Sequence, residues 1–212
     1  MTVADPSEPP IAFVHLGERV PDFAASSLRF AAKGHSGAVV LLTNSSQNLP
    51  PRGEFEVVRI SEWYDASHFE QFRRETTLDP TFRGGFWLHV VERFFVLRQF
   101  MDHSSLDALF HAELDVLVFD LSDVARACDS HGSGIFAVMD DPSRALASLF
   151  YCNSKADFDH FLRFALSQPT MRNEMEMIGE YLQSHPSRGH ALPSDRFFDP
   201  DAHPLSPSGV PD

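Results

Sequence analysis

Two carboxylates stand two residues apart inside the apolar run Phe110–Phe119 (FHAELDVLVF). Strand side chains alternate between the two faces of a sheet, so the run predicts a strand over 109–119 with His111, Glu113 and Asp115 on one face. Two like charges that close repel each other, and burial raises the free-energy cost further. A fold accommodates them most readily when a cation lies between them. The run therefore predicts a site for a hard metal ion beside an anionic group.

The segments around this run predict an alternation of strands and helices. The pattern of apolar residues predicts strands over 11–16, 38–43, 55–60, 109–119, 135–139 and 147–151. It predicts helices over 22–33, 66–75, 86–102, 157–166 and 172–184. This order is typical of an α/β layered fold with a mostly parallel central sheet, in which ligands bind at the carboxyl ends of the strands. Gly84 and Gly85 are expected to break the chain before helix 86–102.

The length and the charge of the chain limit its organisation and its partners. With 212 residues, we expect a single domain over 11–184, a flexible amino terminus over 1–10 and a Pro-rich irregular tail over 185–212. The formal net charge of −13 argues against non-specific binding to nucleic-acid backbones, because such binding needs a basic surface.

No apolar run reaches the length of about 20 residues that a membrane helix needs. The first ten residues also lack the basic and apolar regions of a signal peptide. The sequence therefore predicts a cytoplasmic protein without a transmembrane segment, and it leaves peripheral contact with a membrane open.

Arg93 is an unusual member of its predicted helix. At about 100° per residue, it falls between Leu97 and Phe100 on the helical wheel, away from the arc that holds the other polar side chains. A guanidinium that is buried in this way needs an anionic partner. Glu113, Asp115 or a ligand phosphate would each serve, so a structural ion pair and a ligand contact both stay open.

The run Trp87–Phe119 resembles the donor-binding core of GT-A type, nucleotide-sugar-dependent glycosyltransferases. It is most similar to bacterial proteins in which a helix with an Arg-Phe pair leads into a strand that ends in an acidic DxD-like motif. The motifs that carry the resemblance are ERFF at 92–95 and the segment Phe110–Val116. As an order of elements, the resemblance covers roughly Ile11–Leu182. It implies a GT-A-like layered fold.

The resemblance also implies roles for individual residues. Asp115 would bind Mn²⁺ or Mg²⁺ bridging the two phosphates of a nucleotide-sugar donor, and Glu113 would face the donor ribose or assist the metal. Arg93 would lie near the donor sugar or diphosphate. Glu174 falls where relatives have an Asn-Asp pair on the acceptor side, which makes it a candidate catalytic base or sugar contact. A divalent cation would neutralise the charge that develops on the leaving nucleoside diphosphate.

Two departures from the family pattern leave alternatives open. The motif here is Glu-Leu-Asp instead of Asp-x-Asp, and past Leu182 there is no recognisable counterpart of the family's carboxyl-terminal diphosphate contact. One alternative is a degenerate relative that binds a nucleotide sugar without transferring it. Another is a metal-dependent hydrolase that uses His111, Glu113 and Asp115 as a cluster, although His111 is better explained as a core histidine bonded to backbone. The acceptor stays unassigned, with a surface polysaccharide as the candidate that the family suggests.

Overall fold

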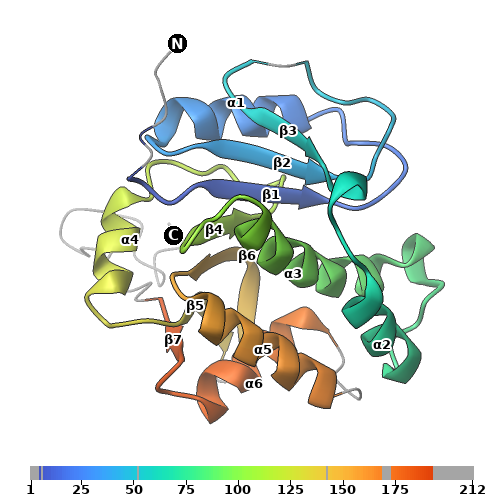
Figure 1. Cartoon of the computed structure of the whole chain (residues 1–212), viewed down its shortest axis with the longest axis vertical. Coiled ribbons are helices and arrows are strands. Elements are labelled where there is room, and N and C mark those ends of the chain that lie inside the picture. Colours follow the sequence, from blue (N-terminus) through green and yellow to red (C-terminus); the bar gives the residue numbers. More distant parts are fainter. Residues whose placement is uncertain (1–4, 6, 52, 142, 169–172, 193–212) are drawn as a thin grey trace, which may run out of the picture.

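The computed structural model describes residue 5 and residues 7–51, 53–141, 143–168 and 173–192. Within this part of the chain, seven strands form one sheet in the order β3-β2-β1-β4-β6-β5-β7 (Figure 1). The strands are β1 (Ile11–His15), β2 (Val39–Thr43), β3 (Glu56–Arg59), β4 (Leu109–Ala112), β5 (Ile135–Asp141), β6 (Arg144–Cys152) and β7 (Gly189–Ala191). Only β6 runs antiparallel to its neighbours, β4 and β5. The predicted α/β fold with a mostly parallel sheet is confirmed.

Helices cover both faces of this sheet. They are α1 (Ala24–Gly34), α2 (Ser67–Glu75), α3 (Phe86–His103), α4 (Ser122–Asp129), α5 (Lys155–Ser167) and α6 (Glu174–Ser184), with 3-10 helices η1 (Ile60–Glu62) and η2 (Phe82–Gly84). Buried side chains of α1 and α4 pack on one face, and those of α2, α3, α5 and α6 pack on the other. The sheet is the middle layer of three. No helix in the described part of the chain has the length and apolar character needed to cross a bilayer.

The central strands are buried on both faces. The apolar run predicted as a strand over 38–43 contains β2, whose five residues are all buried. In β4, Leu109 and His111 face the layer of α3, whereas Phe110 and Ala112 face the layer of α1. Strands that are covered on both sides read as continuous apolar runs, which is why these two were recognisable in the sequence.

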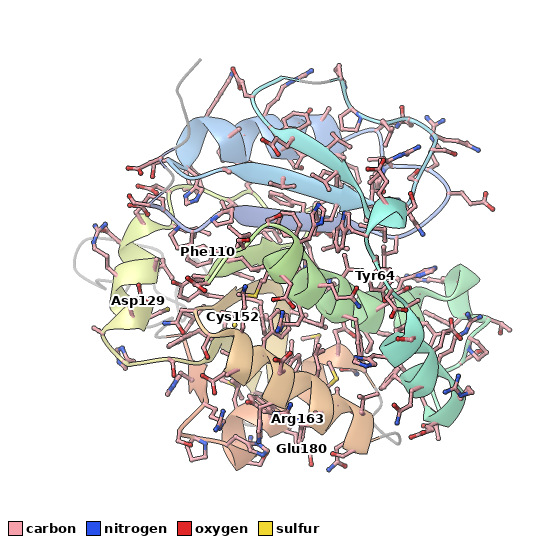
Figure 2. The ribbon with its side chains drawn as sticks, in the orientation of Figure 1. Tyr64, Phe110, Asp129, Cys152, Arg163 and Glu180 are labelled. Carbon is pink, nitrogen blue, oxygen red and sulfur yellow. The ribbon has the colours of Figure 1, made fainter. Side chains whose placement is uncertain are left out.

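Aromatic packing joins β4 to its antiparallel neighbour β6. The ring of Phe110 stacks on the ring of Tyr151, with centroids 4.3 Å apart. Figure 2 shows Phe110 and Cys152 inside the molecule, whereas Arg163 and Glu180 lie on the exposed sides of α5 and α6. This packing holds β4 firmly at the centre of the sheet, and the candidate site extends from its carboxyl end.

The amino-terminal segment is more tightly bound than the flexible stretch predicted over 1–10. The Pro10 carbonyl accepts a hydrogen bond from the Phe110 amide (2.8 Å), and the Pro9 carbonyl accepts one from Nε2 of His35 (2.9 Å). These bonds join residues 9 and 10 to the rest of the fold, and the flexibility of the amino terminus stays a prediction. Residues 1–4 and 6 lie outside the described residues.

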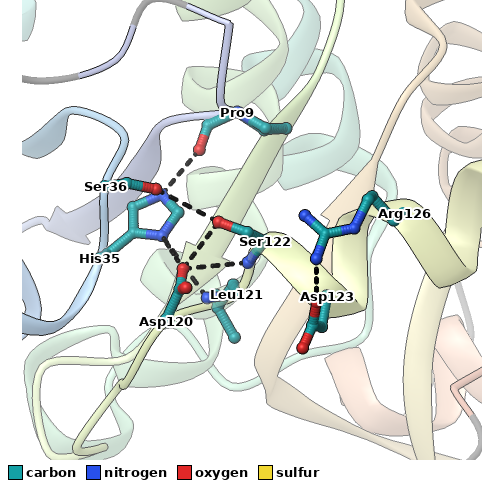
Figure 3. A network of polar contacts seen from close by, with 8 residues as sticks. All are labelled: Pro9, His35, Ser36, Asp120, Leu121, Ser122, Asp123 and Arg126. Atoms are coloured by element: carbon teal, nitrogen blue, oxygen red, sulfur yellow. Dashed lines mark hydrogen bonds and ion pairs between the residues drawn. The ribbon is translucent and has the colours of Figure 1, made fainter.

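His35 joins the end of α1 to the start of α4 (Figure 3). Nδ1 of its ring lies 3.5 Å from a carboxylate oxygen of Asp120. The same Asp120 oxygen accepts hydrogen bonds from the amide (3.1 Å) and the hydroxyl (2.7 Å) of Ser122. On α4 itself, Arg126 forms an exposed ion pair with Asp123. The network holds the far end of the loop that follows β4.

The carboxyl-terminal side also differs from the predicted tail over 185–212. Residues Gly189–Ala191 form β7, which adds to the sheet as a parallel neighbour of β5, and the Leu192 amide donates to the Ala137 carbonyl (2.8 Å). The sequence did not reveal β7 because three residues cannot show an apolar alternation. The prediction also missed α4. Residues 193–212 lie outside the described residues.

The helix predicted over 172–184 begins at Glu174. The side chain of Asn173 caps it by accepting a hydrogen bond from the Glu176 amide (3.0 Å). Asparagine is a favoured residue at this position because its side-chain oxygen satisfies an amide that has no partner within the helix. Residues 169–172 lie outside the described residues.

Candidate functional site

A cavity of about 410 Å³ opens at the carboxyl ends of β1 and β4. Its walls come from the end of β1, the loop after it, the first turns of α3 and the residues that follow β4. The charged and ionisable side chains that line it are His15, Arg83, His89, Arg93, Glu113 and Asp115. Open α/β sheets bind ligands at this edge, where parallel strands end together. We refer to this cavity as the edge pocket.

The two acidic residues lie after β4 and not within a strand. The strand predicted over 109–119 ends at Ala112, and the Val116 amide donates a hydrogen bond to the Glu113 carbonyl (3.1 Å). This bond closes a tight turn that contains Asp115, and aspartate is common in turns because its side chain bonds to nearby backbone. The predicted long strand is therefore wrong, and the turn presents both carboxylates at the sheet edge.

Two of the apolar residues that suggested a longer strand lie on the surface. Leu117 and Phe119 are 61% and 67% exposed. The ring of Phe119 meets the ring of Phe30 on α1 edge-on, with centroids 5.1 Å apart. Contact with α1 replaces pairing within the sheet, and sequence alternation alone does not distinguish the two.

Arg93 is the buried centre of the candidate site. The middle of α3 holds it at 5% exposure, and its Nη1 donates a hydrogen bond to Glu113. Its Nη2 lies 3.5 Å from Oε1 of Glu174, at the start of α6. Three residues predicted for the site from separate segments of the sequence therefore meet in space.

This cluster holds two carboxylates for one guanidinium. Burial raises the pKa of Glu174; the positive charge of Arg93 opposes this rise, and the negative charge of Glu113 adds to it. Among the described residues, Nε and Nη2 of Arg93 and Oε2 of Glu174 have no hydrogen-bond partner. The Arg93–Glu174 contact is thus an ion pair without a hydrogen bond. Buried polar atoms normally have a partner, so a ligand or ordered water would complete the bonding here.

His111 is a core histidine, as the sequence favoured. It is fully buried, and its Nδ1 lies 2.9 Å from the Ala12 carbonyl, to which it donates. Burial, helped by the nearby charge of Arg93, lowers the pKa of His111 to about 3, so the ring is neutral at physiological pH. In the part of the chain that the structure describes, no three His, Cys, Asp or Glu side chains are placed to hold a metal ion together. The His111–Glu113–Asp115 cluster of the hydrolase alternative is therefore not formed.

Glu113 and Asp115 differ in their availability to a cation. Glu113 is held by Arg93, whereas Asp115 is exposed and has no ion pair within the described residues. Mg²⁺ and Mn²⁺ need only one or two protein carboxylates when a phosphate and water complete the coordination. The residues present fit such a cation through Asp115, with Glu113 beside it. The metal itself stays a prediction.

Three ionisable residues of the edge pocket, His15, Arg83 and His89, were not predicted. His15 ends β1 and donates from Nε2 to the Arg19 carbonyl (2.9 Å); burial lowers its pKa, and nearby His89 lowers it further. His89 and Arg83 come from the first turn of α3 and from η2 before it. Their position beside a strand end and a helix start was visible in the sequence, but their proximity to Asp115 depends on tertiary packing.

Comparisons with known proteins reveal a likeness of fold. No model of a protein family matches the sequence, and no curated protein matches it. Among solved structures, a protein described as PaToxG glycosyltransferase matches with a TM-score of 0.50 and 11% identity, over 85% of this chain and 71% of that one. The glycosyltransferase GlyE of Streptococcus pneumoniae TIGR4 matches with a TM-score of 0.50 and 13% identity, over 90% of this chain and 46% of that one.

These similarities concern the arrangement of strands and helices. Together with the seven-stranded sheet, they confirm the GT-A-like layered fold that the resemblance implied. The chain spans less than half the length of GlyE. Fold does not determine activity, so function has to be argued from the edge pocket.

Proposed function

We propose that this protein is a metal-dependent glycosyltransferase that moves a sugar from a nucleoside-diphosphate sugar to an acceptor, with a surface polysaccharide as our candidate acceptor. One observation carries the proposal. The edge pocket brings Asp115 and Glu113 from the end of β4 together with Arg93 from α3, at the sheet edge where α/β folds bind ligands. The similarity of the fold to solved glycosyltransferases supports it.

Each residue has a role that its surroundings support. Asp115 would hold Mg²⁺ or Mn²⁺, and the bound cation would neutralise the charge on the leaving diphosphate. Glu113 is held by Arg93 but is 31% exposed in its side chain, so it can still accept a hydrogen bond from a donor hydroxyl. Arg93 therefore acts as a positioning residue for Glu113. Glu174 balances the charge of Arg93 from the other side.

A binding protein without transferase activity is the second candidate. The observation that favours it is the pairing of both Glu113 and Glu174 with Arg93. Among the described residues, Asp115 is the only carboxylate lining the pocket that has no ion pair. Because Asp115 is also the proposed metal ligand, no other unpaired carboxylate of the described residues is left in the pocket for a second role. Such a protein would bind a nucleotide sugar with metal and release no product.

The first experiment measures thermal stability with UDP, GDP and CMP, each with and without Mn²⁺. A ligand that binds the native state alone raises the unfolding temperature, and the proposal expects this for at least one nucleotide in the presence of metal. Release of nucleotide from a nucleotide sugar then separates transferase from binding protein. No stabilisation by any nucleotide, with or without metal, would overturn both candidates.

The second experiment compares Asp115→Asn with Asp123→Asn. Asp123 is an exposed aspartate on α4, outside the edge pocket, so it controls for the loss of one surface charge. Because removal of a metal-supporting residue typically costs 10- to 100-fold, we expect Asp115→Asn to weaken metal-dependent nucleotide binding by about 100-fold. Asp123→Asn should leave binding unchanged. Equal affinities for the two variants in a titration would exclude Asp115 as a metal ligand.

A further inference from the structure

Arg83 lies at the rim of the edge pocket in an unusual backbone conformation. Its φ and ψ are 47° and 44°, and Gly84 and Gly85 that follow have φ of 69° and 91°. Three consecutive residues are thus left-handed. Glycine adopts this region freely, but for arginine it is strained, because Cβ comes too close to the following carbonyl oxygen. Strain of this kind persists where the surroundings enforce it, and it is concentrated at functional sites.

The loop that carries Arg83 is fastened to the first turn of α3. The ring of Phe82 stacks on the ring of Trp87, with centroids 5.5 Å apart and planes 15° apart. The amides of Leu88 and His89 both donate to the Gly85 carbonyl, at 2.9 and 3.0 Å. The rim therefore has a defined geometry that places Arg83 among the residues lining the pocket.

The other basic groups of the pocket are engaged or neutral. Arg93 contacts the carboxylates of Glu113 and Glu174, and His89 lies 3.6 Å from a carboxylate oxygen of Glu92. Partial burial lowers the pKa of His15, which favours its neutral form.

Arg83 differs from all of these groups. Among the described residues it has no ion pair, and its guanidinium lies over the ring of Phe82, whose centroid is 5.3 Å from Cζ of Arg83. It is an exposed, permanently charged guanidinium at the mouth of a pocket that also contains Asp115 and Glu113. Arginine matches phosphate oxygens with paired hydrogen-bond donors in a fixed plane.

We propose that Arg83 is the diphosphate-binding residue of the edge pocket, in place of Arg93, whose charge the two glutamates already balance. The inference rests on the proposed function and deepens it, because it assigns the phosphate contact to a residue outside the DxD-like motif. A cation held by Asp115 and the guanidinium of Arg83 would meet the diphosphate from different walls of the pocket. The strained backbone at residue 83 is then the conformation that directs this side chain to the ligand.

The test is a calorimetric titration with a nucleoside, its monophosphate, its diphosphate and inorganic pyrophosphate, each with Mn²⁺. Hydrogen bonds to a charged partner typically contribute enough for a 10- to 100-fold effect. We therefore expect Arg83→Ala to weaken diphosphate and pyrophosphate binding by about that factor and to leave nucleoside binding unchanged. Arg29→Ala is the matched control, because Arg29 is an exposed arginine on α1 outside the pocket.

A second variant separates binding from folding. Arg83→Gly removes the side chain and also relieves the left-handed strain, so its unfolding temperature should equal or exceed that of the wild type while diphosphate affinity falls as in Arg83→Ala. Arg83→Lys keeps the charge but loses the planar pair of donors, and it should recover part of the affinity.

The outcomes distinguish this inference from the proposed function. Unchanged diphosphate affinity in Arg83→Ala, with normal wild-type binding, overturns the role of Arg83 and leaves the glycosyltransferase standing. Wild-type binding of pyrophosphate that is lost in Arg83→Ala, without binding of any nucleotide, supports the diphosphate contact and overturns the glycosyltransferase. Absence of both pyrophosphate and nucleotide binding in the wild type overturns both.

Discussion

Two hollows of similar size lie at different places on this protein. The edge pocket measures about 410 Å³, and a second hollow beside α4 measures about 460 Å³. In the second hollow, Asp129 accepts hydrogen bonds from the Tyr151 hydroxyl (3.1 Å) and the Asn153 amide group (2.7 Å). Its acidic group is thus satisfied by its neighbours. In the edge pocket, the guanidinium of Arg93 retains nitrogen atoms without a hydrogen-bond partner among the described residues.

This difference shows what distinguishes a candidate site from a surface depression. Volume does not separate the two hollows, but the balance of charge and hydrogen bonding does. Buried polar groups are normally paired, so the incomplete pairing of Arg93 leaves room for a further hydrogen-bond partner, either ordered water or a ligand. Substitutions that remove a polar contact at one hollow or the other test this difference.

The largest effect is expected for Arg93→Ala. This change would leave the buried carboxylate of Glu174 and the partly exposed carboxylate of Glu113 without a cation, and breaking a buried ion pair in this way costs about 3–5 kcal/mol of unfolding free energy. Arg126→Ala removes an exposed ion pair with Asp123 at the second hollow and should cost about 0.5 kcal/mol. Urea unfolding at pH 7 measures both. Similar losses for the two variants would contradict the distinction between the hollows.

An intermediate effect is expected for Glu174→Gln, and it depends on pH. Burial raises the pKa of Glu174 from its ordinary value of 4.5, so the folded protein keeps a proton that the unfolded chain has released. The contribution of Glu174 to the unfolding free energy is fully present below pH 4.5 and is lost as the pH rises through the raised pKa of the folded state. The glutamine variant has no such loss. The unfolding free energies of wild type and variant should therefore diverge in favour of the variant as the pH rises from 4 to neutrality.

Glu174→Ala serves as the control for this pH series, because it removes the carboxyl group together with its packing. It should show the same flat pH dependence at lower overall stability. Parallel curves for wild type and Glu174→Gln across the whole range would mean that Glu174 titrates alike in the folded and unfolded states, contrary to its burial.

The smallest effect is expected for Tyr151→Phe in the second hollow. The variant loses the hydrogen bond to Asp129 but keeps the buried ring, which should cost about 1 kcal/mol of unfolding free energy. Nucleotide and pyrophosphate affinities should equal those of the wild type, because Tyr151 lies outside the edge pocket. A nucleotide affinity that falls in this variant would instead identify the second hollow as the ligand site.

The parts of the fold with strong apolar patterns were predictable, and the parts defined by local hydrogen bonds were not. The buried strand β2 and the long helix α3 follow from apolar runs without Gly or Pro. The end of β4 could not be predicted in this way, because Leu117 and Phe119 continue the apolar pattern of the strand although they lie outside the sheet. Similarly, β7 depends on its pairing with β5 and has no pattern of its own.

The candidate site shows the same division. The burial of Arg93 followed from helical geometry, and the structure confirms it. Its partner was left open among Glu113, Asp115 and a ligand phosphate, and the structure pairs it with Glu113. The place of Arg83 did not follow, because it depends on a left-handed backbone angle and on the packing of Phe82 against Trp87. Neither property is encoded in a short motif.

The central position of β4 has a consequence for how the protein folds. Its His111 bonds to Ala12, 99 residues earlier in the chain, and β4 also pairs with β6, which lies later in the chain. Contacts between residues this far apart form slowly, because a long loop must close before they contribute. The edge pocket extends from β4, so it should be among the last features to form during folding. Binding competence should then report on completion of the whole sheet more sensitively than helix content does.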